Sequence, residues 1–237
     1  MTSTAVLVLT LWACFVQLQL HQVDGQATTV QKYPFMNAIA FNREFVGNGV
    51  ILAPQWVLTT ASVCLATPDT TYDVLYGADD YLTYNGANPV ERIFRHSGRP
   101  GPENNLALVN VRNAVGYTDT IQPIQLADSN TPDVINVTLV AYGKTESSQT
   151  HLREQPFMLT KCENTLTDPS SVEVVIHDSG WCVASQKDAI QELQRKGQGA
   201  PMVVNGQLYG LYTNEFTIMP NPTAKSEWIQ GIMAGKV

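Results

Sequence analysis

Histidine side chains are the groups in this chain best suited to act as general bases or metal ligands. His96 lies in the sequence Arg95-His96-Ser97, and His151 and His177 have no partner at ligand spacing. Zinc sites combine cysteine and histidine ligands at short, recurring spacings. The sequence therefore predicts no metal site, and we expect no cofactor. A catalytic site would therefore have to be built from the protein's own side chains.

Short β-rich runs separated by turn signals would have to position those side chains. Such runs at such spacing predict an antiparallel sandwich or barrel rather than alternating strands and helices. The runs are Val46–Leu58, Val74–Tyr76, Leu106–Val111, Asn136–Tyr142, Val172–Ile176 and Pro201–Tyr212. In the segment Ala224–Ala234, apolar residues Trp228, Ile229 and Ile232 recur at helical spacing and predict a helix.

The first 25 residues predict a secretory signal peptide. An apolar run from Ala5 to Val16, too short to span a bilayer, is followed by small residues that end at Gly25. Residues 26–237 would form one secreted domain. Without Asp24 it carries 14 basic and 20 acidic side chains, a net charge of −6. This charge argues against nucleic acid and anionic membranes as partners. The sequon at Asn136 predicts an N-linked glycan.

Six segments, in order, resemble those of the trypsin/chymotrypsin family of serine proteases. They are Gly47–Cys64 (GNGVILAPQWVLTTASVC), Asn104–Val111 (NNLALVNV), Thr118–Leu126 (TDTIQPIQL), Leu139–Thr145 (LVAYGKT), Gly197–Thr213 (GQGAPMVVNGQLYGLYT) and the terminal helix. The resemblance implies an all-β fold of two six-stranded antiparallel barrels, at about 30–127 and about 128–223, with a C-terminal α-helix at about 224–234.

The resemblance places the wrong functional group at each catalytic position. A serine protease activates a hydroxyl with an imidazole, which a carboxylate orients. Counting from the two ends of the first segment gives either Val63 or Ser62 at the histidine position. The carboxylate position falls on Asn105 and the nucleophile position on Gln198. Losing the triad typically costs on the order of a millionfold in turnover, so we expect no protease activity.

The accessory groups of the family's mechanism are also replaced. Lys196 stands where the family has the glycine of the oxyanion hole, and Gly197 stands where it has the aspartate that binds the activated N-terminus. No basic cleavage site and no Ile-Val-Gly-Gly-like sequence lies before Tyr33. The joint loss of groups that serve one mechanism indicates a chain that no longer hydrolyses peptides.

The cysteines follow the same resemblance. Cys162 and Cys182 match a disulfide bridge of the family's second barrel, whereas Cys64 should pair with a cysteine at the position of Gly47, and that partner is missing. An unpaired cysteine in a secreted chain is either buried or available for an intermolecular bond. We favour burial for Cys64, with a disulfide to a partner kept as the alternative.

Two further residues have competing interpretations. The resemblance places His96 where family members carry a histidine outside the active site, so we favour a surface role over metal binding. It places Glu192 near the base of the family's specificity pocket. However, Ser185–Asp188 is similar to a capping box, and Glu192 with Lys196 makes a favourable i,i+4 pair. We favour a short helix over a working pocket.

The sequence therefore predicts a secreted, non-catalytic serine protease homologue. Inactive homologues of this family, common in insects, act as adaptors, cofactors or decoys in extracellular protease cascades, including immune melanisation, and in seminal-fluid protein networks. The expected partners are other secreted proteins, such as an active protease or its substrate. The alternatives are a hydrolase with a displaced nucleophile, such as Ser179 or Ser185, and a protein that binds a ligand in the altered cleft.

Overall fold

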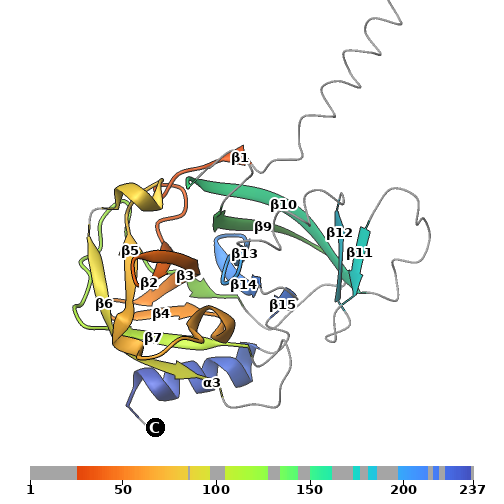
Figure 1. Ribbon diagram of the computed structural model, residues 1–237. Coiled ribbons are helices and arrows are strands. Elements are labelled where there is room, and N and C mark those ends of the chain that lie inside the picture. The colour runs from red at the N-terminus through yellow and green to blue at the C-terminus, as the bar shows by residue number, and fades with distance from the viewer. Residues whose placement is uncertain are drawn as a thin grey trace, which may run out of the picture.

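Antiparallel strands dominate the computed structural model (Figure 1). The structure describes residues 26–84, 86–96, 105–127, 134–143, 150–161, 173–176, 181–185, 197–212, 216–218 and 222–235. Its strands fall into two sheets that pack against each other, and a helix close to the C-terminus lies beside the first sheet (Figure 1). The predicted all-β fold is thereby confirmed.

The first sheet is a closed six-stranded barrel. Its strands pair in the order β2-β3-β4-β7-β6-β5. They are β2 (Met36–Phe41), β3 (Glu44–Ala53), β4 (Trp56–Thr59), β5 (Tyr72–Tyr76), β6 (Ala87–Arg95) and β7 (Ala107–Val111). Side chains of alternate residues point to opposite faces of a strand. In β2, Ile39 therefore packs into the barrel's own core, while Met36 and Ala38 join the core shared with the second sheet.

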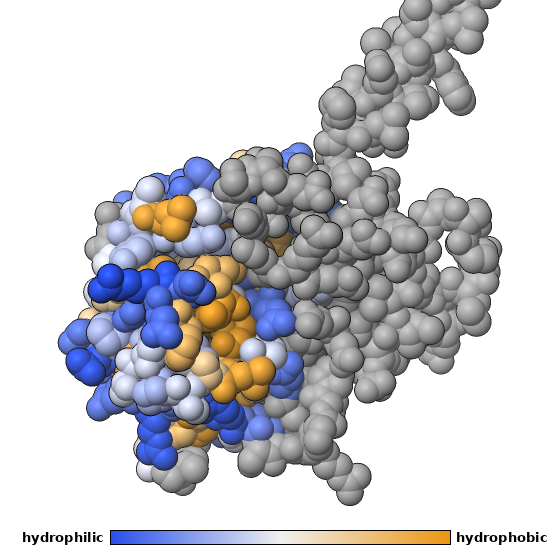
Figure 2. Space-filling model, viewed as in Figure 1, coloured by the Kyte–Doolittle hydropathy of each residue, from blue (hydrophilic) through white to orange (hydrophobic). Residues whose placement is uncertain are grey.

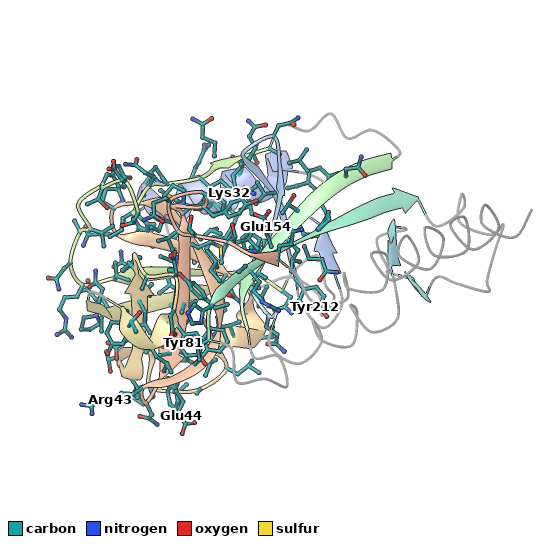
Figure 3. The ribbon with its side chains drawn as sticks, turned by 90° about the horizontal axis from the view of Figure 1, so that it is seen from above. Lys32, Arg43, Glu44, Tyr81, Glu154 and Tyr212 are labelled. Carbon is teal, nitrogen blue, oxygen red and sulfur yellow. The ribbon has the colours of Figure 1, made fainter. Side chains whose placement is uncertain are left out.

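Short 3-10 helices connect the strands of the barrel. They are η1 (Ala61–Cys64), η2 (Asp69–Thr71) and η3 (Tyr81–Thr83). Between β2 and β3, Asn42 and Arg43 have φ values of 51° and 68°. Positive φ at both central residues is the requirement of the type I′ turn that matches the twist of paired strands. This hairpin projects Arg43 and the neighbouring Glu44 away from the core (Figure 3).

The second sheet follows the path β11-β12-β10-β9-β13-β14-β15. Its strands are β9 (Val134–Tyr142), β10 (Leu152–Lys161), β11 (Glu173–Ile176), β12 (Trp181–Ser185), β13 (Pro201–Val204), β14 (Gln207–Tyr212) and β15 (Phe216–Ile218). Two short strands from the other half join it: β1 (Gln26–Ala27) pairs with β10, and β8 (Gln125–Leu126) pairs with β14. Among the described residues, the path does not return to its first strand.

The helix α3 (Pro222–Met233) confirms the predicted terminal helix, although it begins two residues before the expected start at Ala224. Ile229 and Ile232 are buried against the shared core. Trp228 meets the ring of His96 edge-on, with 4.9 Å between ring centroids. His96 is therefore half-buried against the helix rather than on a free surface as expected. No helix in the described parts of the chain is long and apolar enough to cross a membrane.

Asn48 of β3 connects the two sheets. Its side chain is completely buried. The backbone N–H of Asn48 donates to the carbonyl of Gln198 at 2.8 Å, and its Nδ2 donates to the same oxygen at 3.3 Å. Its Oδ1 accepts the N–H of Tyr142, in β9, at 2.7 Å. One amide from the first barrel thus satisfies buried backbone groups from two separate segments of the second.

Gly199 makes the close approach at Asn48 possible. Its φ is +77°, and a Cβ there would come within 2.0 Å of the Asn48 carbonyl oxygen, so no other residue fits without displacing backbone. Thr59 stabilises the same junction, because its Oγ1 donates to the Asn48 carbonyl oxygen at 2.7 Å. The junction between the sheets therefore depends on one buried asparagine, one threonine hydroxyl and one glycine.

The residues just after the predicted signal peptide are fixed to the second sheet. Lys32 donates to both carboxylate oxygens of Glu154 in β10, at 2.6 and 2.7 Å, and Thr28 donates to the same carboxylate (Figure 3). Burial acts to raise the pKa of Glu154, but the hydrogen bonds from Lys32, Tyr33 and Thr28 outweigh it and leave the pKa lowered. A second contact holds the same segment, because Oδ1 of Asp79 accepts the N–H of Val30 at 2.7 Å.

We predict that Asn48→Ala destabilises the protein by about 1–3 kcal/mol, because the N–H of Tyr142 would be left buried without an acceptor. Asn136→Ala is the matched control, since Asn136 is exposed on β9 and should change stability by no more than about 0.5 kcal/mol. Denaturant unfolding of protein made in a non-glycosylating host measures both. Equal stabilities for the two variants would contradict a structural role for Asn48.

Candidate functional site

Ser62, a residue of η1, forms a reciprocal pair with Asn105. The backbone N–H of Ser62 donates to Asn105 Oδ1 at 2.8 Å, and Asn105 Nδ2 donates to Ser62 Oγ at 3.3 Å. The hydroxyl of Thr60 lies 3.0 Å from the same Oγ. Two of the residues that the sequence placed at catalytic positions are therefore in contact. Thr60 completes the group and was not predicted.

This pair does not activate the Ser62 hydroxyl. A nucleophilic serine needs a base that accepts its proton, whereas Asn105 Nδ2 is a donor and can only donate to the oxygen. The hydroxyl of Thr60 is far too weak a base for the task. Because Ser62, Thr60 and Asn105 are all neutral, the arrangement holds no charge and needs no counter-ion. The three residues form a small network of hydrogen bonds with one another.

Val63 takes the place beside Gly47. A Cβ added to Gly47 would lie 2.5 Å from Cγ2 of Val63 and 2.9 Å from the Gln198 carbonyl oxygen. The sequence expected Cys64 to face Gly47, but the structure places the preceding residue there. The two candidates for the histidine position therefore have different surroundings, since Ser62 contacts Asn105 while Val63 fills the space at Gly47.

Cys64 points into the interior of the first barrel. Its thiol is completely buried among aliphatic side chains of the barrel core, and the cysteine is free. Burial raises the pKa of the Cys64 thiol to about 12. A protonated thiol with no solvent access does not exchange with disulfides. The buried state favoured from the sequence therefore matches the structure better than an intermolecular bond.

Gln198 lies in the turn that joins the second sheet to Asn48. Gln198 is half-buried, and Gly197 beside it is buried. The turn is closed by the N–H of Ala200, which donates to the Gly197 carbonyl at 2.9 Å, and by the N–H of Gly199, which donates to Tyr212 at 2.7 Å. The turn is therefore rigid, yet Gln198 offers an amide rather than a nucleophile, and Gly197 has no carboxylate to bind an ammonium.

Several predicted features lie outside the described residues or side chains. They are the Cys162–Cys182 bridge, Lys196, Glu192, Ser179, Ser185 and His177. Asn136 is exposed on β9, a position accessible to a glycan. Nδ1 of His151 lies 3.9 Å from Oδ2 of Asp80. Among the described residues no three histidine, cysteine, aspartate or glutamate side chains gather in a group that could hold a metal ion.

Two antiparallel sheets joined at the Gln198 turn, with a closed first barrel and a terminal helix, define a protein of the chymotrypsin fold class. Residues 22–217 match the family model described as Trypsin. The chain therefore belongs to the trypsin family.

Two proteins of similar sequence agree with this family assignment. Trypsin delta of Drosophila erecta is 25% identical over 206 residues, which cover 82% of this chain and 78% of that protein. Kallikrein-4 of Homo sapiens is 26% identical over 201 residues, which cover 80% of this chain and 74% of that protein.

Solved structures show the same fold. The scabies mite inactivated protease paralogue S-D1 has a TM-score of 0.70 at 20% identity, with 90% of this chain and 97% of that chain covered. Human heparin binding protein has a TM-score of 0.65 at 15% identity, with 89% of this chain and 96% of that chain covered.

We predict that Cys64 does not react with an aromatic disulfide reagent at pH 8 while the protein is folded. A thiol with a pKa of about 12 has only about 10⁻⁴ of its population as thiolate at that pH. After unfolding in guanidinium, Cys64 should react within seconds. Peptide mapping after alkylation identifies the labelled cysteine in each state. Rapid labelling of Cys64 in the folded protein would contradict its burial.

Proposed function

We propose that this chain is a secreted, non-catalytic member of the trypsin family that acts by binding other proteins. Its role would be that of an adaptor, cofactor or decoy in an extracellular protease cascade or a seminal-fluid protein network. The expected partner is an active protease or the substrate of one. This proposal includes removal of residues 1–25 as a signal peptide.

The observation that carries the proposal is the Ser62–Asn105 pair. In an active member of the family, a base and a carboxylate would occupy the positions to which Ser62 and Asn105 are assigned by their segments. Here they are an alcohol and an amide, held by hydrogen bonds of 2.8 and 3.3 Å. Neither can remove a proton from a nucleophile at neutral pH. Gln198, assigned to the nucleophile position, could not use such a base in any case.

Retention of the scaffold supports a binding role. The junction at Asn48 and the rigid turn at Gln198 hold the former catalytic positions in place although the groups needed for hydrolysis are gone. A rigid barrel that carries exposed loops is a common platform for protein recognition. The fold-level likeness to an inactivated protease paralogue is consistent with a non-catalytic role.

The charge of the chain restricts the kind of partner. The heparin binding protein among the structural neighbours is named for an anionic ligand, but this chain has a formal net charge of −7. An acidic surface repels sulfated polysaccharides and nucleic acids. We therefore propose protein partners, attracted to exposed apolar and acidic surface, rather than a polyanion.

Leu65 offers a specific place to test. It follows η1 directly and is 75% exposed, although it is a large apolar residue. Apolar side chains also gather in a patch on the face shown in Figure 2, among mostly hydrophilic surroundings. Exposed apolar side chains beside a former active site are candidates for the centre of a protein interface. Leu82 in η3 is 67% exposed and serves as the matched control.

We predict that the tagged protein retains a stoichiometric protein partner when it is incubated with its native extracellular fluid without reductant. Leu65→Asp should reduce recovery of the partner at least tenfold, whereas Leu82→Asp should leave it unchanged. Quantitative mass spectrometry of the retained proteins measures both effects. Because Cys64 is buried, the partner should be recovered equally with and without reductant.

Two results would contradict this account. Absence of any stoichiometric partner in the native fluid would remove the adaptor role. Release of the partner only by reduction, with peptide mapping that places the disulfide at Cys64 rather than at Cys162 or Cys182, would mean that the burial described for Cys64 does not hold in the native complex.

A further inference from the structure

The dipeptide Asn-Gly occurs at three places in this chain, Asn48-Gly49, Asn85-Gly86 and Asn205-Gly206. An asparagine followed by glycine is chemically labile, because the glycine has no Cβ to shield its backbone nitrogen from the asparagine side chain. Asn85 lies outside the described residues. The other two pairs have the same sequence but opposite surroundings, so we expect different chemical fates for them.

Asn205 and Gly206 form an exposed two-residue turn. They join β13 to β14, where Val204 pairs with Gln207 (Figure 1). Their φ values are 50° and 76°, both in the left-handed region that a type I′ turn requires. The hydrogen bond that closes such a turn uses the N–H of its fourth residue, here Gln207, and does not require the N–H of Gly206. Apart from its chain neighbours, nothing lies within 4 Å of the place a Cβ would take at Gly206.

Asn48 and Gly49 are buried in the middle of β3. Both ends of the Asn48 amide are held, since Nδ2 donates to the Gln198 carbonyl and Oδ1 accepts the N–H of Tyr142. Both bonds would have to break before the side-chain carbon could reach the nitrogen of Gly49. A carboxylate at position 48 would also be buried against the Gln198 carbonyl with no proton to donate. This pair is therefore protected while the two sheets remain joined.

We propose that Asn205 is a site of spontaneous deamidation in the folded protein, and that Asn48 is modified only when the junction between the sheets opens. The nitrogen of Gly206 loses its proton to water or hydroxide and attacks Cγ of Asn205. The N–Cγ bond forms, the Cγ–Nδ2 bond breaks, and the leaving nitrogen takes up a proton and departs as ammonia. Water then opens the resulting succinimide at either carbonyl and gives aspartate or isoaspartate.

The reaction uses only water and involves no oxidation or reduction. It requires none of Ser62, Asn105 and Gln198, so it is independent of the protein-binding role proposed above. Either proposal can therefore fail without the other.

Deamidation would change the β13–β14 hairpin in two ways. It adds one negative charge at an exposed position, and isoaspartate adds one methylene group to the main chain of the turn. A type I′ turn matches the twist of its strands with two residues of ordinary length, so the isoaspartyl form should weaken the end of the hairpin. Met202 and Val203 still pair with β9, so the fold should be kept. Protein that has aged in solution would therefore differ from new protein at this turn.

The test is prolonged incubation of the purified, folded protein, made in a non-glycosylating host, at pH 8. Peptide mapping in mild acid, where the reaction is slow, measures the modified fraction at each asparagine. The fraction at Asn205 should exceed that at Asn48 at least tenfold, and its product should contain isoaspartate. A sample kept at pH 5 should change less, because the nitrogen of Gly206 must lose a proton. In guanidinium the two asparagines should react at similar rates, since only the fold distinguishes them.

Two variants test the structural reasons. Asn205→Gln keeps a primary amide but would need a six-membered ring, so the modification at position 205 should be lost. Thr59→Val removes the hydroxyl that donates to the Asn48 carbonyl. A weaker junction should open more often and raise the modified fraction at Asn48 about fivefold, while the fraction at Asn205 stays the same.

Four results would overturn the proposal. If Asn205 stays unmodified in the folded protein but reacts in guanidinium, the turn keeps its side chain away from the nitrogen of Gly206. If only aspartate forms, the amide is hydrolysed directly and no succinimide is involved. If Asn48 reacts as fast as Asn205 in the folded protein, or if its rate is unchanged in Thr59→Val, the junction does not protect it.

Discussion

The buried amide of Asn48 is the interaction on which the arrangement of the two sheets depends. It belongs to the first barrel, yet its donors and its acceptor are used by backbone groups of the second half, at Gln198 and Tyr142. Such groups would be costly to bury unpaired. The glycine at 199 follows from this constraint, because any side chain there would collide with the Asn48 carbonyl. The Gln198 turn is held against the first barrel by this junction.

The replacements around the junction are consistent with one another. A carboxylate at position 105 would need a cation or several donors close by, whereas Asn105 supplies one acceptor and one donor that Ser62 matches. Val63 fills the space beside Gly47 with methyl groups. Active sites commonly carry charges and strain that lower stability. The network of Ser62, Thr60 and Asn105 is neutral and carries no such charge.

Much of the fold could be predicted from the sequence, because strand and helix patterns are local. The terminal helix was found within two residues from the spacing of Trp228, Ile229 and Ile232. The choice between Ser62 and Val63 could not be made, since one extra residue in a loop shifts the count. The contact of Ser62 with Asn105 and that of Val63 beside Gly47 arise only in the folded chain. The half-buried state of His96 depends on Trp228, more than 130 residues away. Asn48 looked like an ordinary polar residue in a β-rich run, because its burial arises from tertiary packing.

The central claim is that the family's scaffold is kept without its hydrolytic chemistry, and the most direct measurement is labelling of the purified, folded protein with a fluorophosphonate probe. Trypsin is the positive control, and heat-denatured protein gives the background. The account predicts labelling of the folded protein equal to that background, and no change in Ser62→Ala. Labelling of the folded protein that heat abolishes would contradict it, and peptide mapping would then identify the serine responsible.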